Sequence, residues 1–169
     1  MDALNSFVRL FTLNDAVATQ RITERLALVL RDPAAYQAQY AEELAERGIL
    51  GALPAQELRD VALIDALLSE ELLWEADWKD PAADLVYGLN ETLAQQQRTE
   101  RLAEPAVGRA TTTGPEALDM VQDLLEPLGL ALVLLTLDSD SHALSVVAEA
   151  QVAEMRTLAQ QLGFSLKVY

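Results

Sequence analysis

The chain has 169 residues, of which 51% are hydrophobic and 23% charged, which suits one folded domain and excludes an intrinsically disordered chain. Its 12 basic residues face 27 acidic ones, and the formal charge of −15 disfavours binding to nucleic acid or to an anionic membrane and favours a basic partner. Cysteine is absent, which excludes disulfides and thiolate metal sites.

The N-terminus carries an acid, Asp2, where a secretory signal would carry a basic residue. The longest apolar run, from Leu128 to Leu137, is far shorter than the roughly 20 residues that span a bilayer. We therefore expect a cytoplasmic protein without membrane contacts, and the oligomeric state stays open.

Residues 1–69 have the pattern of successive helices, because their apolar residues recur at intervals of three and four. Asp32 and Pro33 mark the start of one helix, since Asp is a favoured N-cap and Pro a favoured first helical residue. Gly48 is placed to end that helix, and Pro54 opens the next one. The predicted apolar faces contain Leu4, Phe7, Val8, Phe11, Val17, Ile22, Leu26, Val29, Leu30, Tyr36, Tyr40, Leu44, Leu58, Val61, Ile64, Leu67 and Leu68.

From Glu70 the pattern changes to an alternation of apolar and polar residues. Leu72, Trp74 and Ala76 are at the spacing of one strand face, which predicts a short strand, although Trp74 and Trp78 are also at helical spacing. Pro81 opens a further helix, and a long connection without periodicity follows it at residues 98–113.

Residues 113–169 predict a helix, a β-hairpin, a second helix and a final strand. Thr113 and Glu116 have the spacing of a capping box that opens the first helix. The hairpin strands are predicted at 130–137 and 142–147 around a tight turn at 138–141, the second helix at 149–162 and the last strand at 164–168.

These elements predict one α+β domain that spans residues 1–169. In it, a helical N-terminal half (1–69) packs on a small, mostly antiparallel sheet formed by residues 70–169, which end in a C-terminal β-hairpin–helix–strand unit. The order of the strands is not determined by these patterns.

The common catalytic and phosphate-binding motifs are missing from the sequence, including glycine-rich phosphate loops and H-E-x-x-H. A site with several histidine ligands is impossible within one chain, because His142 is the only histidine. The sequence leaves the question of catalysis open and favours a protein that is not an enzyme.

The segment from Glu70 to Asp84 is unusual, because it holds both tryptophans and one of the two lysines among acidic residues. Aromatic rings beside carboxylates are suited to capture a basic peptide or an arginine side chain. The alternative is that the rings anchor the core, while the acids cap the following helix or stay solvated. As a partner-binding surface, the segment would use Trp74, Glu75, Asp77, Trp78, Lys79 and Asp80.

A second unusual segment lies between the two predicted hairpin strands. Asp138 and Asp140 could coordinate Mg²⁺ or Ca²⁺ through oxygen atoms, and with Glu149 they match positions 1, 3 and 12 of an EF-hand count. The match then fails, because His142 takes position 5 and Ala143 takes the position of the required glycine. The alternative is that Asp and Ser side chains close the hairpin through their own hydrogen bonds.

The C-terminal two-thirds of the chain contain short motifs that can be compared with a known family. These are Asp77-Trp78-Lys79-Asp80, Leu135-x-Leu137-Asp138-Ser139-Asp140-Ser141-His142-x-Leu144-x-x-Val147 and Leu162-Gly163-Phe164. They resemble an uncharacterised bacterial domain-of-unknown-function family, number sixty-six-thirty, in which we expect a tyrosine more often at the position of His142. The resemblance implies a bacterial intracellular protein with an α+β fold, adds no catalytic residue, and leaves the helical N-terminal part unexplained.

The leading hypothesis from the sequence is a non-enzymatic protein-binding module, of the inhibitor or immunity-protein kind, that holds a basic partner without a cofactor. The alternative is a divalent-metal-binding protein or metal-dependent hydrolase that uses Asp138 and Asp140, with Glu75 or Asp77 brought near by strand pairing. Mg²⁺ or Ca²⁺ would then be the cofactor. Whether the acidic segments 70–84 and 138–142 meet in space is left open.

Overall fold

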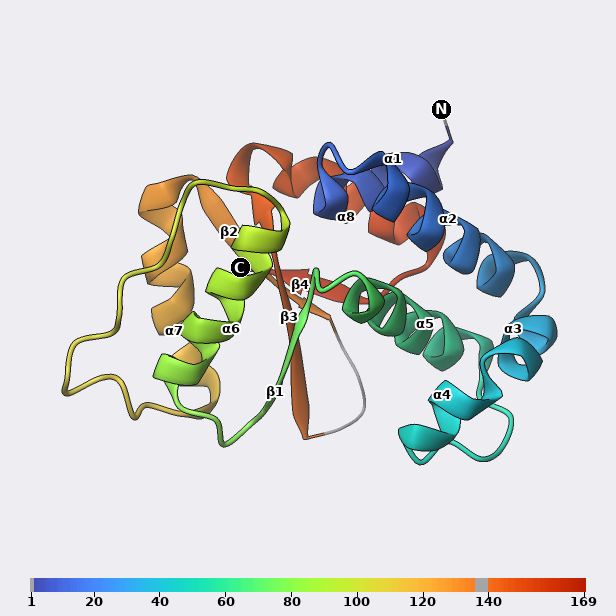
Figure 1. Ribbon diagram of the computed structural model, residues 1–169, viewed down its shortest axis with the longest axis horizontal. Coiled ribbons are helices and arrows are strands. Elements are labelled where there is room, and N and C mark those ends of the chain that lie inside the picture. The colour runs from blue at the N-terminus through green and yellow to red at the C-terminus, as the bar shows by residue number, and fades with distance from the viewer. Residues whose placement is uncertain (1, 136–139) are drawn as a thin grey trace.

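Four short strands form one antiparallel sheet in the order β1-β3-β2-β4, as seen in a computed structural model that describes residues 2–135 and 140–169 (Figure 1). The strands are β1 (Trp74–Asp77), β2 (Leu130–Leu135), β3 (Ser141–Ala148) and β4 (Leu166–Val168). The hairpin strands β2 and β3 are central, and β1 and β4 form the two edges of the sheet.

Helices cover both faces of this sheet. One layer consists of α1 (Ala3–Thr12), α2 (Ala16–Arg31), α5 (Ala55–Ser69) and α8 (Val152–Leu162), extended by the short helices α3 (Pro33–Gln39) and α4 (Ala41–Glu46). The other layer consists of α6 (Ala82–Gln95) and α7 (Gly114–Leu125), and two 3-10 turns follow α7 and precede α8 at Glu126–Leu128 and Glu149–Gln151. Figure 1 shows α6 and α7 on one side of the strands and the N-terminal helices with α8 on the other.

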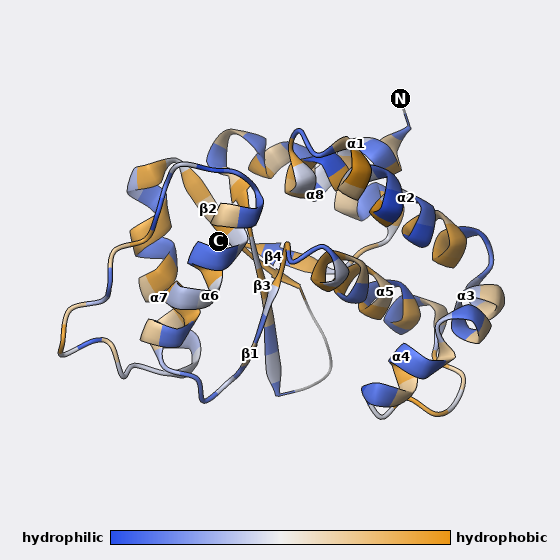
Figure 2. Cartoon of the chain, viewed as in Figure 1, coloured by the Kyte–Doolittle hydropathy of each residue, from blue (hydrophilic) through white to orange (hydrophobic). Residues whose placement is uncertain are grey.

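The strand sequences explain this two-sided burial. In β2, Ala131, Val133 and Leu135 belong to the core beneath the N-terminal helices. Leu130 and Leu132, which alternate with them, belong to the core beneath α6 and α7. A strand that is buried on both faces is apolar along its whole length, and β2 has this appearance in Figure 2. Each side of the sheet therefore has its own hydrophobic core.

Three aspartates begin the first three helices. The side chains of Asp2, Asp15 and Asp32 accept hydrogen bonds from backbone N–H groups three residues ahead, at 2.7, 2.9 and 3.0 Å. Such N-caps each stabilise a helix by about 1 kcal/mol. The predicted helix start at Asp32 and Pro33 is confirmed.

The predicted α+β class, with a helical N-terminal half and C-terminal antiparallel strands, is confirmed. The capping box at Thr113 is wrong, because the Thr113 side chain makes no capping hydrogen bond. Next to it, Gly114 has a left-handed backbone (φ 65°), and its N–H donates to the carbonyl oxygen of Trp78, so a backbone hydrogen bond to another segment holds this helix start rather than the Thr113 side chain. Within the described ranges, no helix is long and apolar enough to cross a membrane.

Candidate partner-binding site

The edge strand β1 presents its side chains alternately to the two helical layers. Ala76 is buried in the core beneath α6 and α7, and Trp74 packs against the same core. Glu75 lies between them in sequence and interacts with Arg47, the residue that ends α4. The predicted partner-binding residues therefore divide between two faces of the sheet.

Trp74 is half-buried and lies directly on α6. A Cβ atom added at Gly88 would lie 2.1 Å from Cδ2 of Trp74, so only glycine permits this close approach. The Trp74 ring also meets Tyr87 edge to face, with ring centroids 5.9 Å apart. The Trp74 Nε1 atom is buried and has no acceptor among the described residues. The ring is thus held by packing against the helix.

Glu75 takes part in an ion-pair network that joins β1 to the N-terminal helices. Arg47 donates to both carboxylate oxygens of Glu75, at 2.9 and 3.1 Å, and its Nε donates to Asp65 Oδ1 at 2.7 Å. Burial lowers the pKa of Arg47, but its hydrogen bonds to the two acids outweigh that effect and raise the pKa above its usual range. Burial raises the pKa of Asp65, and Arg47 only partly opposes that rise. This network fixes the position of β1.

A cavity of about 530 Å³ lies along β1, between the end of α5 and one side of α6. Two acidic side chains, Glu71 and Glu91, are exposed at this cavity. Neither forms an ion pair in the part of the chain that the structure describes. The lining residues are Leu68, Glu71, Leu73, Trp74, Glu75, Tyr87, Glu91, Thr92, Ala94 and Gln95. The cavity thus combines aromatic walls with negative charge.

Glu71 occupies a backbone position that usually belongs to glycine. Its φ is 58°, its N–H donates to the carbonyl oxygen of Leu68, and the N–H of Leu72 donates to that of Leu67. These bonds define a Schellman motif at the end of α5, with Glu71 at the left-handed position. A residue with a Cβ atom costs about 1 kcal/mol in this conformation. Glu71 at this position therefore makes the fold less stable than glycine would.

Tyr87 and Glu91 were not among the binding residues predicted from the sequence. They are four residues apart and exposed, so they share one face of α6. The sequence contains the spacing that places an aromatic residue and an acid on one exposed face of this helix. That spacing indicates a binding site only in combination with the contact between Trp74 of β1 and Tyr87, which the sequence does not show.

The residues after β1 form a turn, and Asp77, Trp78, Lys79 and Asp80 do not line this cavity. The N–H of Asp77 donates to Asp80 Oδ2, and the N–H of Lys79 donates to Asp77 Oδ1, both at 2.9 Å. Trp78 is 45% exposed, and Lys79 Nζ lies 5.3 Å from the centre of its ring. Both aspartates therefore bond to the backbone of the turn.

The two acidic segments meet in space at this turn. Asp77 pairs with Ser141 across β1 and β3, and the N–H of Trp78 donates to the carbonyl oxygen of Asp140 at 2.9 Å. Asp138, the other predicted metal ligand, lies outside the described residues. Among residues 2–135 and 140–169, there is no group of three or more acidic or histidine side chains that could hold a metal ion.

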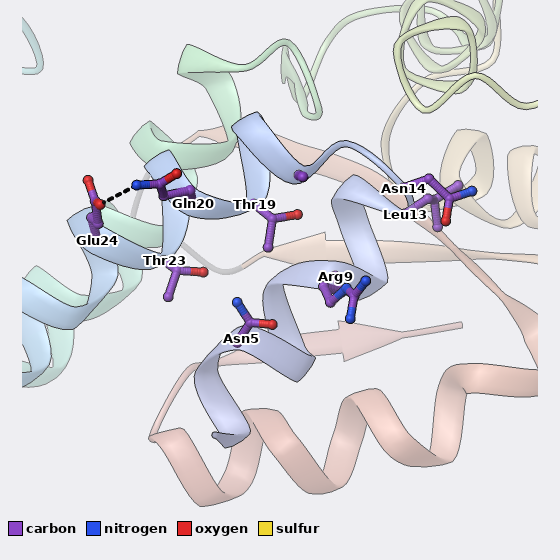
Figure 3. Close-up of a pocket in the computed structure, with 9 residues that line it drawn as sticks. Asn5, Arg9, Leu13, Asn14, Thr19, Gln20, Thr23 and Glu24 are labelled. Atoms are coloured by element: carbon purple, nitrogen blue, oxygen red, sulfur yellow. Dashed lines mark hydrogen bonds between the residues drawn. The ribbon is translucent and has the colours of Figure 1, made fainter. Parts of the chain in front are cut away.

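Two further cavities lie among the N-terminal helices. In Figure 3, Asn5 and Arg9 of α1 lie across from Thr19 and Thr23 of α2 around a cavity of about 300 Å³. Glu24, the acidic residue that lines this cavity, accepts a hydrogen bond from the Gln20 side chain, which is also drawn there.

The other of these two cavities, of about 500 Å³, borders Arg25, which pairs with Glu43 at 2.6 Å and lies 4.0 Å from the centre of the Tyr40 ring. Glu24 at the first cavity and Arg25 at this one thus already have partners within the chain. The unpaired acids of the cavity beside β1 distinguish it from both.

The fold and this cavity define an α+β protein whose sheet has an acidic, aromatic cavity at one edge. The chain belongs to the family described as domain of unknown function DUF6630, which matches residues 3–169. The resemblance seen in the sequence is thereby confirmed, and the match also includes the N-terminal helices. A search of curated proteins gives no match, and neither does a search of solved structures.

Proposed function

We propose that this protein is a non-enzymatic protein-binding module that holds a basic partner at the cavity beside β1. A lysine or arginine side chain of the partner enters the cavity, between the ring of Trp74 and the carboxylates of Glu71 and Glu91. The observation that carries this proposal is the pair of acids without ion pairs next to two aromatic rings.

The chemistry of the cavity suits a cationic side chain. A cation over an indole face gains about 0.5–1 kcal/mol at an exposed site and more where water is excluded. The carboxylates add an attraction that no arginine or lysine of the described chain already satisfies. A guanidinium or ammonium group is therefore the ligand group that the cavity fits best.

The surroundings of the cavity favour binding with little reorganisation. Trp74 is fixed against Gly88, and Glu75 is fixed by two hydrogen bonds from Arg47. Preorganised walls reduce the entropy lost on association. The net charge of −15 also accelerates the approach of a basic protein and makes its association sensitive to salt.

Covering a basic surface is how an inhibitor or immunity protein acts, and we assign this module to that kind of role. The assignment rests on the charge and on the absence of a catalytic constellation in the sequence. It requires no metal ion or cofactor.

The proposal is tested by a pull-down from native cell extract at low and high salt, with bound proteins identified by mass spectrometry. Wild type is compared with the double variant Glu71→Gln, Glu91→Gln. The matched control is Glu116→Gln, Asp119→Asn, which makes the same charge change on the exposed face of α7.

We expect a basic protein that is retained at low salt by wild type and by the control, released at high salt, and lost with the cavity variant. Equal retention by the cavity variant contradicts this placement of the site. A column that retains no basic protein contradicts the proposed function itself.

A further inference from the structure

We infer that the basic partner binds as an extended segment, which adds a fifth strand to the free edge of β1 and places one lysine or arginine side chain in the cavity. This inference rests on the proposed function and specifies how the partner is recognised. It is carried by the direction of the backbone groups of β1, which is independent of the charges in the cavity.

Among residues 2–135 and 140–169, the sheet order β1-β3-β2-β4 leaves the outer side of β1 without a neighbouring strand. In an antiparallel pair, successive residues direct their backbone N–H and C=O groups alternately toward the partner strand and away from it. The N–H of Trp78 donates to Asp140 just beyond β3, so Trp74 and Ala76, at even spacing from it, also face β3. The backbone groups of Glu75 and Asp77 therefore point outward.

One end of this outer edge is closed by the chain itself. The outward N–H of Asp77 donates to Asp80 Oδ2 at 2.9 Å, and its carbonyl oxygen accepts from the N–H of Asp80 at 2.9 Å. The outward groups of Glu75 have no such partner among the described residues. An edge strand with unpaired backbone groups is a template for another strand.

The cavity lies along the open part of the same edge. Leu73, Trp74 and Glu75 line it, and Tyr87 and Glu91 line it from α6. Side chains alternate between the two faces of a strand, so an added strand would direct every second side chain toward the face that carries Trp74. A basic residue at such a position reaches the aromatic rings and the unpaired acids, and its neighbours in the segment face the Glu75 and Arg47 side.

Charge decides which occupant fits. A second copy of this chain carries the same formal charge of −15 and is repelled, whereas a basic segment complements both the cavity and the net charge. Backbone hydrogen bonds to Glu75 would supply affinity, and the basic side chain in the cavity would supply specificity.

The test uses three synthetic peptides and the full chain. The parent is acetyl-Lys-Val-Lys-Val-Lys-amide, in which all lysines share one face of an extended strand. One analogue carries N-methyl groups on the backbone amide nitrogens of the lysines, and the other carries them on the backbone amide nitrogens of the valines. Because successive residues direct their N–H groups to opposite edges of a strand, each analogue blocks the donors on one edge only. Dissociation constants come from isothermal titration calorimetry, and amide exchange of Glu75 is followed by NMR.

Strand addition predicts that one methylated analogue loses about tenfold or more in affinity, because one or two hydrogen bonds are lost, while the other binds like the parent. It also predicts that exchange of the Glu75 amide slows when the parent binds. Equal binding of all three peptides, or unchanged exchange at Glu75, overturns strand addition.

The proposed function is tested separately by the Glu71→Gln, Glu91→Gln variant. If the parent binds this variant more weakly than wild type but methylation has no effect, the cavity is the site and the strand is not formed. If the parent binds neither protein, or binds both equally, the proposed function and strand addition are both wrong.

Discussion

The contact between Trp74 and Gly88 gives the sharpest prediction for stability. A Cβ atom at position 88 would lie 2.1–2.2 Å from three atoms of the Trp74 ring. Ordinary carbon contacts are at about 3.5 Å, so the ring has to move by about 1.4 Å toward the cavity. Overpacking of this kind costs about 1–3 kcal/mol, whereas replacing glycine by alanine inside a helix gains about 1 kcal/mol. We expect Gly88→Ala to lower the free energy of unfolding by about 1 kcal/mol.

The same substitution reverses its sign once the ring is absent. In a Trp74→Ala background, Gly88→Ala meets no steric conflict with the ring and should stabilise the protein by about 1 kcal/mol through helix propensity alone. Urea unfolding of the four proteins, followed by circular dichroism, gives the coupling energy directly. A change of the same sign and size in both backgrounds would refute the packing described for Trp74.

Two further predictions concern Glu71 and Arg47. Glu71→Gly should raise the free energy of unfolding by about 1 kcal/mol, since glycine suits the left-handed backbone, and it should weaken peptide binding. The control is Gln97→Gly, at the equivalent position after α6 (φ 58°) and outside the cavity. In urea unfolding it should stabilise the protein by a similar amount, and it should leave the affinity for the peptide unchanged. A loss of stability in Glu71→Gly, or a loss of binding in both variants, would contradict this. Arg47→Ala should destabilise by about 3 kcal/mol at pH 7, because it leaves the buried Asp65 without its ion-pair partner. Removing Arg47 raises the pKa of Asp65 further above its unfolded value, so the difference in unfolding free energy from wild type should grow as the pH rises from about 4 to 7. In an Asp65→Asn background, adding Arg47→Ala should change the unfolding free energy without that pH dependence, and its persistence there would exclude Asp65 as the cause.

Local patterns predicted most of the elements but not their arrangement. The apolar run at 130–137 and the Asp32-Pro33 start depend on neighbours in sequence. The strand is confirmed over Leu130–Leu135, and the helix start is confirmed at Pro33. The pairing of Trp74 with Leu144 joins residues far apart in the chain, so no local pattern could show it. The burial of the sheet on both faces depends likewise on where α6 and α7 pack.

The candidate site was predicted in part for the same reason. Trp74 and Glu75, both predicted from their aromatic and acidic neighbourhood, lie at the cavity. The Glu75 carboxylate also accepts hydrogen bonds from Arg47, which is 28 residues away in sequence and which no local pattern could connect to it. Tyr87 and Glu91 entered the site only through the packing of α6 on β1. Partner binding stays a prediction for Trp74 and Glu75 as well as for Asp77 and the turn residues after it.

The central claim is that a basic segment binds between β1 and α6, and the two tryptophans allow it to be tested in one titration. The indole of Trp74 lines the cavity, and that of Trp78 does not, so Trp78 is an internal control. In a ¹⁵N NMR titration with acetyl-Lys-Val-Lys-Val-Lys-amide, we expect saturable shifts of the Trp74 indole and of the Glu75 and Glu91 amides, with the Trp78 indole unchanged. Shifts of the Trp78 indole alone, or no saturable shift at the cavity, would contradict the claim.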